Sequence, residues 1–162
     1  MSQPAREIEP IFFELLGRII TRWAFAETLL NEFLAFLLKA DHGLTYVVTS
    51  NVSGSTVADW IRTIFKIYAA GDEAAITTIN DLLNQIDDVR GQRNRLAHGV
   101  WATHASGPGT VAVQTINWQR TEIVKIELVT TADLNDLLDE IGEIIGKLRA
   151  LGTTLGFLNR PN

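Results

Sequence analysis

A helical repeat of apolar residues near the start of the chain constrains the fold more than any other feature. Its members recur at spacings of four and three residues, the period of one helix face; they are Leu16, Ile20, Trp23, Glu27, Leu30, Leu34 and Leu37. Glu27 is the one charged residue in this stripe. Pro10 fits the first turn of such a helix, where its missing N–H is harmless. The sequence therefore predicts a long helix from Pro10 that ends at Asp41-His42-Gly43.

The same region argues against a membrane span, although it is the most apolar part of the chain. Charged residues are spread through Ile11 to Leu38, namely Glu14, Arg18, Arg22, Glu27 and Glu32. The first ten residues, MSQPAREIEP, have no apolar run typical of a secretory signal. The sequence contains no cysteine, which excludes disulfides and thiolate metal sites and permits a reducing compartment. A cytoplasmic protein without a membrane partner is therefore expected.

Further helices are predicted after this first one. Residues 45–55 are rich in turn and cap formers and predict a connection. Helical periodicity resumes at Thr56 and continues to near Gly71, and a third helix begins near Asp72 and ends at Gly99. Apolar residues from Leu134 to Leu151 form one more helical face.

The pattern between the last two helices is different. β-branched residues alternate with polar ones over Val111–Trp118 and Glu122–Val129, which predicts two strands, and Trp101–His104 is a further short candidate. The predicted fold is mainly α. It is an antiparallel bundle of four main helices, with a small β-hairpin or meander inserted between helices three and four.

Charge limits how this chain could bind nucleic acid. The net charge is −5, whereas nucleic-acid-binding domains usually carry a basic surface. Any contact with RNA must therefore depend on a local cluster, and the densest one is Arg90, Arg93 and Arg95. Since no His, Asp and Glu residues occur at metal-ligand spacing, neither a metal nor another cofactor is expected.

That cluster lies in a recognisable segment, Arg93-Asn94-Arg95-Leu96-Ala97-His98. It resembles the motif of the HEPN family, which is Arg, four to six residues, then His. HEPN domains are small helical bundles, and many are metal-independent ribonucleases. The resemblance covers residues 1–162 in predicted architecture, as a single HEPN-like domain, but only residues 93–99 in sequence.

The resemblance implies an endoribonuclease that leaves 2′,3′-cyclic phosphate and 5′-hydroxyl ends. It also implies a homodimer in which two motifs face each other in a composite cleft. A toxin or defence effector fits this description. Such a protein would be restrained by an antitoxin, for example a small nucleotidyltransferase-like protein.

The residue types suit this chemistry. Histidine moves protons near neutral pH, so His98 is the candidate general acid or base for attack by the ribose 2′-OH. Arginine stays protonated and presents a planar fork of donors, so Arg93 is the candidate that stabilises charge on the phosphate. Asn94 could orient the imidazole or a phosphate oxygen. Arg90, Arg95 and Glu27 are supporting or RNA-binding candidates.

The spacing of the motif poses a geometric problem. At 100° per residue, Arg93 and His98 lie about 140° apart on a continuous helix. Arg90, Asn94 and His98 instead share one stripe. The two residues converge either within one protomer, if the helix ends and turns near Gly99, or across the two-fold axis of a dimer.

Structural explanations compete with these functional ones. Glu27 and Arg93 both occupy apolar faces, so a buried pair between Glu27 and Arg93 or Arg90 would account for them without catalysis. His98 could simply interact with the last carbonyls of its helix. The chain could then be a non-catalytic HEPN-like module that binds RNA, a nucleotide or a protein, or a plain helical dimerisation domain. The acidic total charge favours these two alternatives, and the intact motif favours the nuclease.

Overall fold

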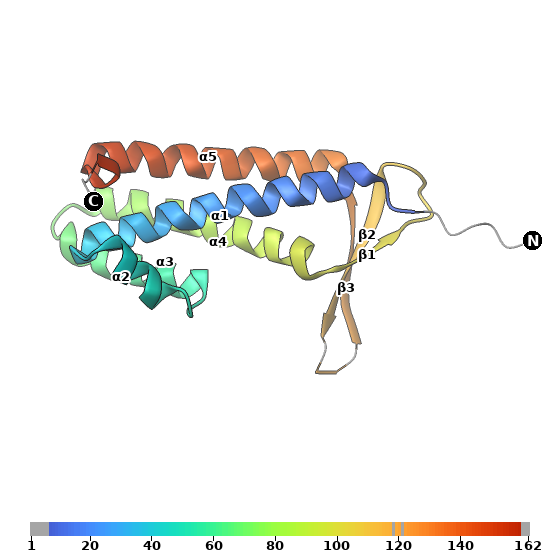
Figure 1. The fold of residues 1–162 in the computed structure, drawn as a ribbon, viewed down its shortest axis with the longest axis horizontal. Helices are drawn as coiled ribbons and strands as arrows, with labels where there is room; N and C mark the ends of the chain where they lie inside the picture. Colours follow the sequence, from blue (N-terminus) through green and yellow to red (C-terminus); the bar gives the residue numbers. More distant parts are fainter. Residues whose placement is uncertain (1–6, 118, 121, 160–162) are drawn as a thin grey trace, which may run out of the picture.

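The computed structural model describes residues 7–117, 119–120 and 122–159. These residues form a mainly helical fold with a small antiparallel sheet, as the sequence predicts (Figure 1). The α-helices are α1 (Pro10–Leu38), α2 (His42–Thr49), α3 (Gly54–Tyr68), α4 (Glu73–His98) and α5 (Thr131–Leu155), and α5 is followed by a short 3-10 helix, η1 (Phe157–Asn159). The strands are β1 (Val100–Thr103), β2 (Thr110–Asn117) and β3 (Glu122–Thr130).

The prediction of a connection over residues 45–55 is wrong at both ends, because residues 45–49 belong to α2 and residues 54 and 55 to α3. α1 ends where Lys39 adopts the left-handed conformation, with φ at 53°. The side chain of Asp41 then accepts a hydrogen bond from the backbone N–H of Leu44 at 3.0 Å and caps a new helix. The described residues therefore contain five α-helices rather than four, and the sheet lies between the fourth and the fifth.

Helix direction also departs from the predicted antiparallel bundle. In Figure 1, α1 and α5 both run from the sheet toward the opposite end of the molecule, whereas α4 runs back toward the sheet. The unpredicted α2 explains this difference, because it adds one reversal of the chain between α1 and α3. The first and last helices consequently pack side by side in the same direction.

The core is built around α1, but its buried face is rotated from the predicted stripe. Phe12, Leu15 and Ile19 are buried, whereas Ile20, a predicted stripe member, is 44% exposed. The predicted and observed faces coincide from Trp23, which is 1% exposed. Glu27 therefore lies at the border of the buried face and is half-buried. None of the described helices combines the length and the apolar character needed to cross a membrane.

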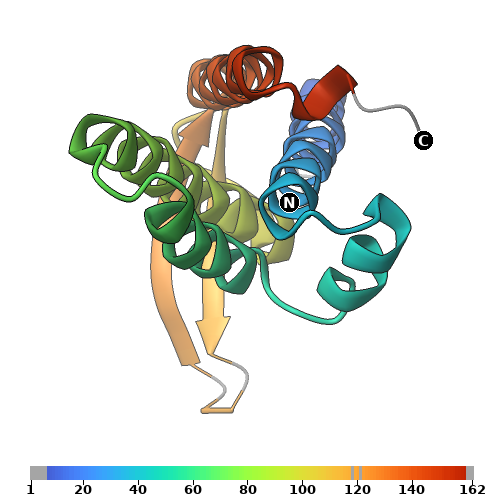
Figure 2. The same cartoon turned by 90° about the vertical axis from the view of Figure 1, so that its left-hand side faces the viewer.

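The strands form one sheet in the order β1-β2-β3 at one end of the helices (Figures 1 and 2). They agree with the predicted strands, although Trp118 lies outside the described residues. One face packs on the helices through Val111, Val113 and Val129, which are buried. The β2–β3 hairpin extends beyond the helices, so that much of β3 is exposed (Figure 1).

The chain passes directly from β3 into α5 through a capping box. The hydroxyl of Thr130 accepts a hydrogen bond from the backbone N–H of Asp133, and the Asp133 carboxylate accepts one from the backbone N–H of Thr130 at 2.7 Å. The side-chain and backbone hydrogen bonds from Thr130 lower the pKa of Asp133. This cap fixes where the last helix leaves the sheet.

Candidate functional site

The candidate motif lies on the last turns of α4, which remains helical through His98. The helix ends and the chain turns at Gly99, as one of the two predicted routes requires, but the turn follows the histidine, so His98 keeps its helical direction. The two side chains leave the helix about 140° apart. Consistent with that angle, Arg93 is directed toward α1, while His98 is exposed.

Arg93 is held on three sides. Its Nη2 donates to Oε1 of Glu27 at 3.3 Å, and its Nη1 donates to Oδ1 of Asn94 at 2.8 Å. The guanidinium carbon lies over the ring of Trp23, 5.6 Å from the centroid, at a distance typical of a cation–π contact. The side chain is 18% exposed. The group is therefore fixed in orientation before any ligand binds.

Part of the hydrogen-bonding capacity of Arg93 remains unused. A guanidinium has five N–H donors, and the bonds to Glu27 and Asn94 use two of them. Its Nε is buried and has no hydrogen-bond partner among the described residues. Because this nitrogen is closed to solvent, a ligand would meet the remaining N–H groups on the two Nη nitrogens instead.

Glu27 and Asn94 thus act on the arginine. The structure pairs Glu27 with Arg93, which settles the choice between Arg93 and Arg90. The predicted burial of that pair is wrong for the carboxylate, because the Glu27 side chain is 39% exposed. The Asn94 carbonyl oxygen accepts a hydrogen bond from Arg93 and not from an imidazole, and its other predicted role, to orient a phosphate oxygen, stays a prediction.

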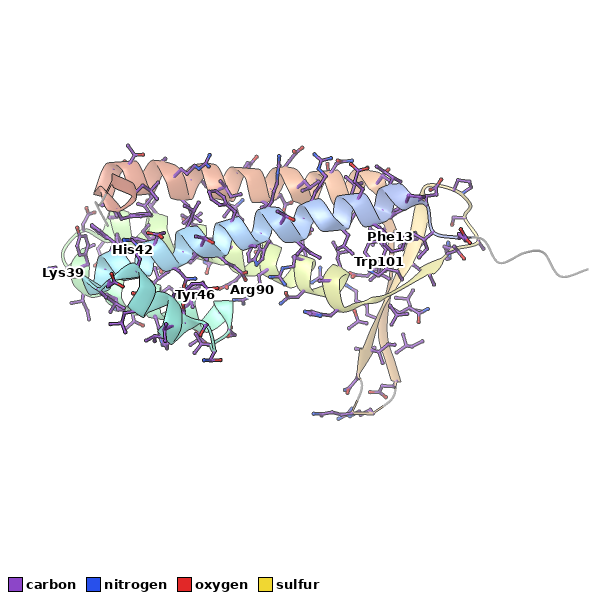
Figure 3. The ribbon with its side chains drawn as sticks, viewed as in Figure 1. Phe13, Lys39, His42, Tyr46, Arg90 and Trp101 are labelled. Atoms are coloured by element: carbon purple, nitrogen blue, oxygen red, sulfur yellow. The ribbon has the colours of Figure 1, made fainter. Side chains whose placement is uncertain are left out.

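His98 is the last residue of α4 and is exposed. Across residues 7–117, 119–120 and 122–159, no side chain forms a hydrogen bond or an ion pair with its imidazole. His98 lies in the last turn of α4, as the structural alternative requires, but the side chain that donates to a terminal carbonyl is Trp101, whose Nε1 donates to the carbonyl oxygen of Leu96 at 2.8 Å. Trp101 also contacts Phe12 and Phe13 at the sheet end of the molecule (Figure 3). The histidine is therefore available to a ligand or a partner.

Gly99 permits the sharp change from α4 to β1. A Cβ at this position would lie 2.4 Å from Cγ1 of Val113 and 2.6 Å from the carbonyl oxygen of Arg95. The glycine is required by this close approach of backbone and sheet, because its φ of −75° is ordinary for any residue. The close packing fixes His98 beside the sheet.

The other two arginines of the basic cluster have carboxylate partners. Nη1 of Arg90 lies 3.1 Å from Oδ1 of Asp87, and the other carboxylate oxygen, Oδ2, accepts a hydrogen bond from Nη2 of Arg62 at 2.6 Å. Nε of Arg95 donates to Oε2 of Glu127 on β3 at 3.2 Å. These pairs offset much of the positive charge that the sequence concentrates in this segment.

Glu127 connects α4 to the sheet. It accepts a hydrogen bond from Lys125, and this bond, together with the positive charge of Arg95, lowers the pKa of its carboxyl group against the opposing effect of burial. Glu127 is therefore charged at neutral pH and bridges a lysine on its own strand and an arginine on the last turn of α4. The sequence pattern did not reveal this link, because the two residues are far apart in the chain.

A pocket of about 340 Å³ lies beside the arginines, between α1, α2 and α3. Its lining includes Glu27, Asn31, Tyr46 and Gly54. A Cβ on Gly54 would lie 3.5 Å from Cδ of Arg90, so Arg90 stands at the same wall, and both Tyr46 and Arg90 are visible on this side in Figure 3. Oδ1 of Asn31 is buried without a hydrogen-bond partner in the described residues. Sequence reasoning missed this pocket, because α2 contributes one wall.

The structure thus brings Arg93, Asn94 and Glu27 together, with Trp23 added, and leaves His98 apart from them. No protein-family model, curated protein or solved structure matches the chain.

The Glu27–Arg93 pair gives a stability prediction. Since the Glu27 side chain is 39% exposed, water screens the pair, and Glu27→Gln is expected to lower the free energy of unfolding by about 1 kcal/mol or less. Urea denaturation measures this change, with Glu14→Gln as the control, since Glu14 is an exposed residue of α1. A loss of about 3–5 kcal/mol would instead mean that the pair behaves as a fully buried one.

Proposed function

We propose that this chain is a metal-independent endoribonuclease of the HEPN type, with α1, α3, α4 and α5 as its helical bundle. The observation that carries the proposal is that α4 presents an arginine in a fixed orientation and, on another face, a histidine that is free to bind a ligand. Arg93 is oriented by three neighbours and keeps unused donors, whereas His98, on a different face, is exposed and unpartnered in the described residues. These are the two groups that RNA transesterification needs.

The reaction would begin with attack by the ribose 2′-oxygen on the adjacent phosphorus. A new O2′–P bond forms and the P–O5′ bond breaks, which gives a 2′,3′-cyclic phosphate and a 5′-hydroxyl. An imidazole of His98 takes the 2′-OH proton or supplies a proton to the leaving O5′. Arg93 donates hydrogen bonds to the phosphate oxygens, where negative charge increases in the transition state.

A homodimer would let the two groups act on one phosphate. Because α4 directs Arg93 and His98 about 140° apart, one protomer cannot easily aim both at a single atom. A two-fold axis near the end of α4 would place His98 of one copy beside Arg93 of the other. It would also supply two imidazoles, one for each proton transfer.

The biological setting follows from the resemblance. The proposed nuclease would be a cytoplasmic toxin or defence effector, held inactive by an antitoxin such as a small nucleotidyltransferase-like protein. A neighbouring reading frame that encodes such a protein would support this setting.

The alternative is a non-catalytic HEPN-like module that binds RNA, a nucleotide or a protein. Two observations favour it. Each of Arg90, Arg93 and Arg95 already has a carboxylate partner, and the net charge is −5. The pocket lined by Asn31 and Tyr46, with Arg90 at its wall, is large enough to hold part of a nucleotide.

One experiment tests the nuclease directly. The purified protein is incubated with labelled single-stranded RNAs and with DNA of the same sequences, in the presence of EDTA. RNA should be cut to products with 2′,3′-cyclic phosphate ends, and DNA should stay intact because it lacks the 2′-OH. Cleavage that disappears with EDTA would contradict the mechanism, and inactivity on diverse RNAs would favour the binding module.

A further inference from the structure

The outer edge of β3 is an unpaired strand edge. β3 is the last strand in the order β1-β2-β3, and eight of its nine residues pair with β2 on one side, with Val124 left out at a β-bulge, while no described strand pairs with the other side. Ile123, Val124, Ile126 and Leu128 are 53%, 62%, 57% and 52% exposed. An exposed, apolar edge strand readily pairs with another strand.

The sequence of β3 is complementary to itself in one antiparallel register. If two copies of β3 pair about a two-fold axis at Ile126, Lys125 of each copy lies opposite Glu127 of the other. In the same register, Ile126 lies opposite its own copy, and Val124, the residue of the β-bulge, comes near Leu128. Opposite charges and apolar pairs directly across an antiparallel ladder both stabilise it.

Neighbouring registers lack this complementarity. An axis at Lys125 would place the two lysines opposite each other, and an axis at Glu127 would do the same with the two glutamates, which is destabilising. An axis at Val124 would leave Lys125 opposite Ile123. The charge pattern therefore selects Ile126 as the centre.

We propose that β3 is the interface for a second copy of this chain, so that two three-stranded sheets join into one continuous sheet through antiparallel β3–β3 pairing centred on Ile126. A two-fold axis perpendicular to the sheet keeps each face on its own side. The helices of both copies then cover the same face of the joined sheet. The projecting hairpin visible in Figures 1 and 2 leaves this edge open to a partner.

This arrangement also bears on the proposed nuclease, and that part of the inference rests on the proposed function. Glu127, next to the axis residue, accepts a hydrogen bond from Arg95 at 3.2 Å. The last turn of α4 in each copy is therefore tied to the strand that forms the interface, and His98 ends that turn. Pairing through β3 would bring both α4 ends toward one axis.

A single cysteine tests the register, because the natural chain has none. Opposed residues in an antiparallel pair have Cα atoms about 4.5–5.5 Å apart. That separation lies within the range of about 4.4–6.8 Å that a disulfide spans. Ile126→Cys should therefore form a disulfide-linked dimer under mild oxidation at micromolar concentration.

Val124→Cys is the matched control, since Val124 lies on the same strand and is equally exposed. In the proposed register, its sulfur would lie four residues along the strand from its own copy, about 14 Å away, and should not cross-link. Equal cross-linking of both variants, or of neither, would overturn the proposal.

Charge reversal gives a second measurement by sedimentation velocity. Lys125→Glu should weaken the wild-type dimer, because it places glutamates opposite each other, and adding Glu127→Lys should restore it. An unchanged dimer in Lys125→Glu would contradict the register. RNA cleavage by the wild type is assayed in parallel. If Ile126→Cys cross-links but the wild type does not cleave RNA, the proposed function is contradicted and the proposed interface is not.

Discussion

Replacement of His98 by alanine is expected to lower the rate of RNA cleavage by about 10²–10⁴-fold, the usual contribution of general acid–base catalysis. The imidazole is the one group of the motif that exchanges protons readily near neutral pH, because arginine stays protonated. His98 is exposed, and its imidazole makes no hydrogen bond or ion pair with the described residues, so its loss should leave the fold intact.

Single-turnover cleavage of a labelled RNA measures this effect, and urea denaturation of the variant checks the fold. His104→Ala is the matched control, since His104 lies in the β1–β2 loop and its Nδ1 is hydrogen-bonded to Ser106 at 2.8 Å. The control should keep the wild-type rate. If His98→Ala cleaves RNA as fast as the wild type, the histidine does not carry the proton transfer.

The sequence predicted most of the elements because their patterns are local. The boundaries of α1, α4 and the two long strands agree with the periods of apolar residues and with the switch to alternation after Gly99. The buried face of α1 was harder to predict, because the apolar stripe through Leu16 and Ile20 is as regular as the one through Leu15 and Ile19. The neighbouring α5 determines which of them is buried, and sequence periodicity does not contain that packing.

α2 shows a second limit. Asp41-His42-Gly43 predicts the end of one helix, but the same aspartate also caps the next. The β-branched residues Thr45, Val47, Val48 and Thr49 weaken the helical signal. α2 also reverses the chain and forms a wall of the pocket. Because the sequence did not predict α2, it predicted neither the observed helix directions nor the pocket.

The part of the candidate site that consists of charged residues on otherwise apolar helix faces could be predicted from the sequence. Glu27 and Arg93 interrupt apolar faces of two helices, and they do pair. The contact of Arg93 with Trp23 and the use of Trp101 to satisfy the Leu96 carbonyl depend on how distant segments meet. Those contacts carry no signal in the spacing of the residues.

Replacement of Arg93 by lysine is expected to lower the rate of RNA cleavage by about 10²-fold or more, comparable to the loss of a preorganised transition-state donor. Lysine keeps the positive charge but cannot present two parallel N–H groups to a phosphate. The planar guanidinium of arginine can donate to Glu27 and Asn94 and still direct further N–H groups at a ligand, which the single ammonium group of lysine cannot do. The same assay as for His98 measures this loss.

Arg149→Lys is the matched control, because Arg149 also lies over an aromatic ring, with its guanidinium carbon 5.0 Å from the centroid of Phe25. It sits on the exposed surface of α5, away from the motif. Both variants lose an arginine–aromatic contact and keep a positive charge, so a fall in rate confined to Arg93→Lys reports on the phosphate contact. Full activity in Arg93→Lys would instead assign Arg93 to holding α4 against Glu27 and Trp23 of α1, and the catalytic charge would have to come from another cation.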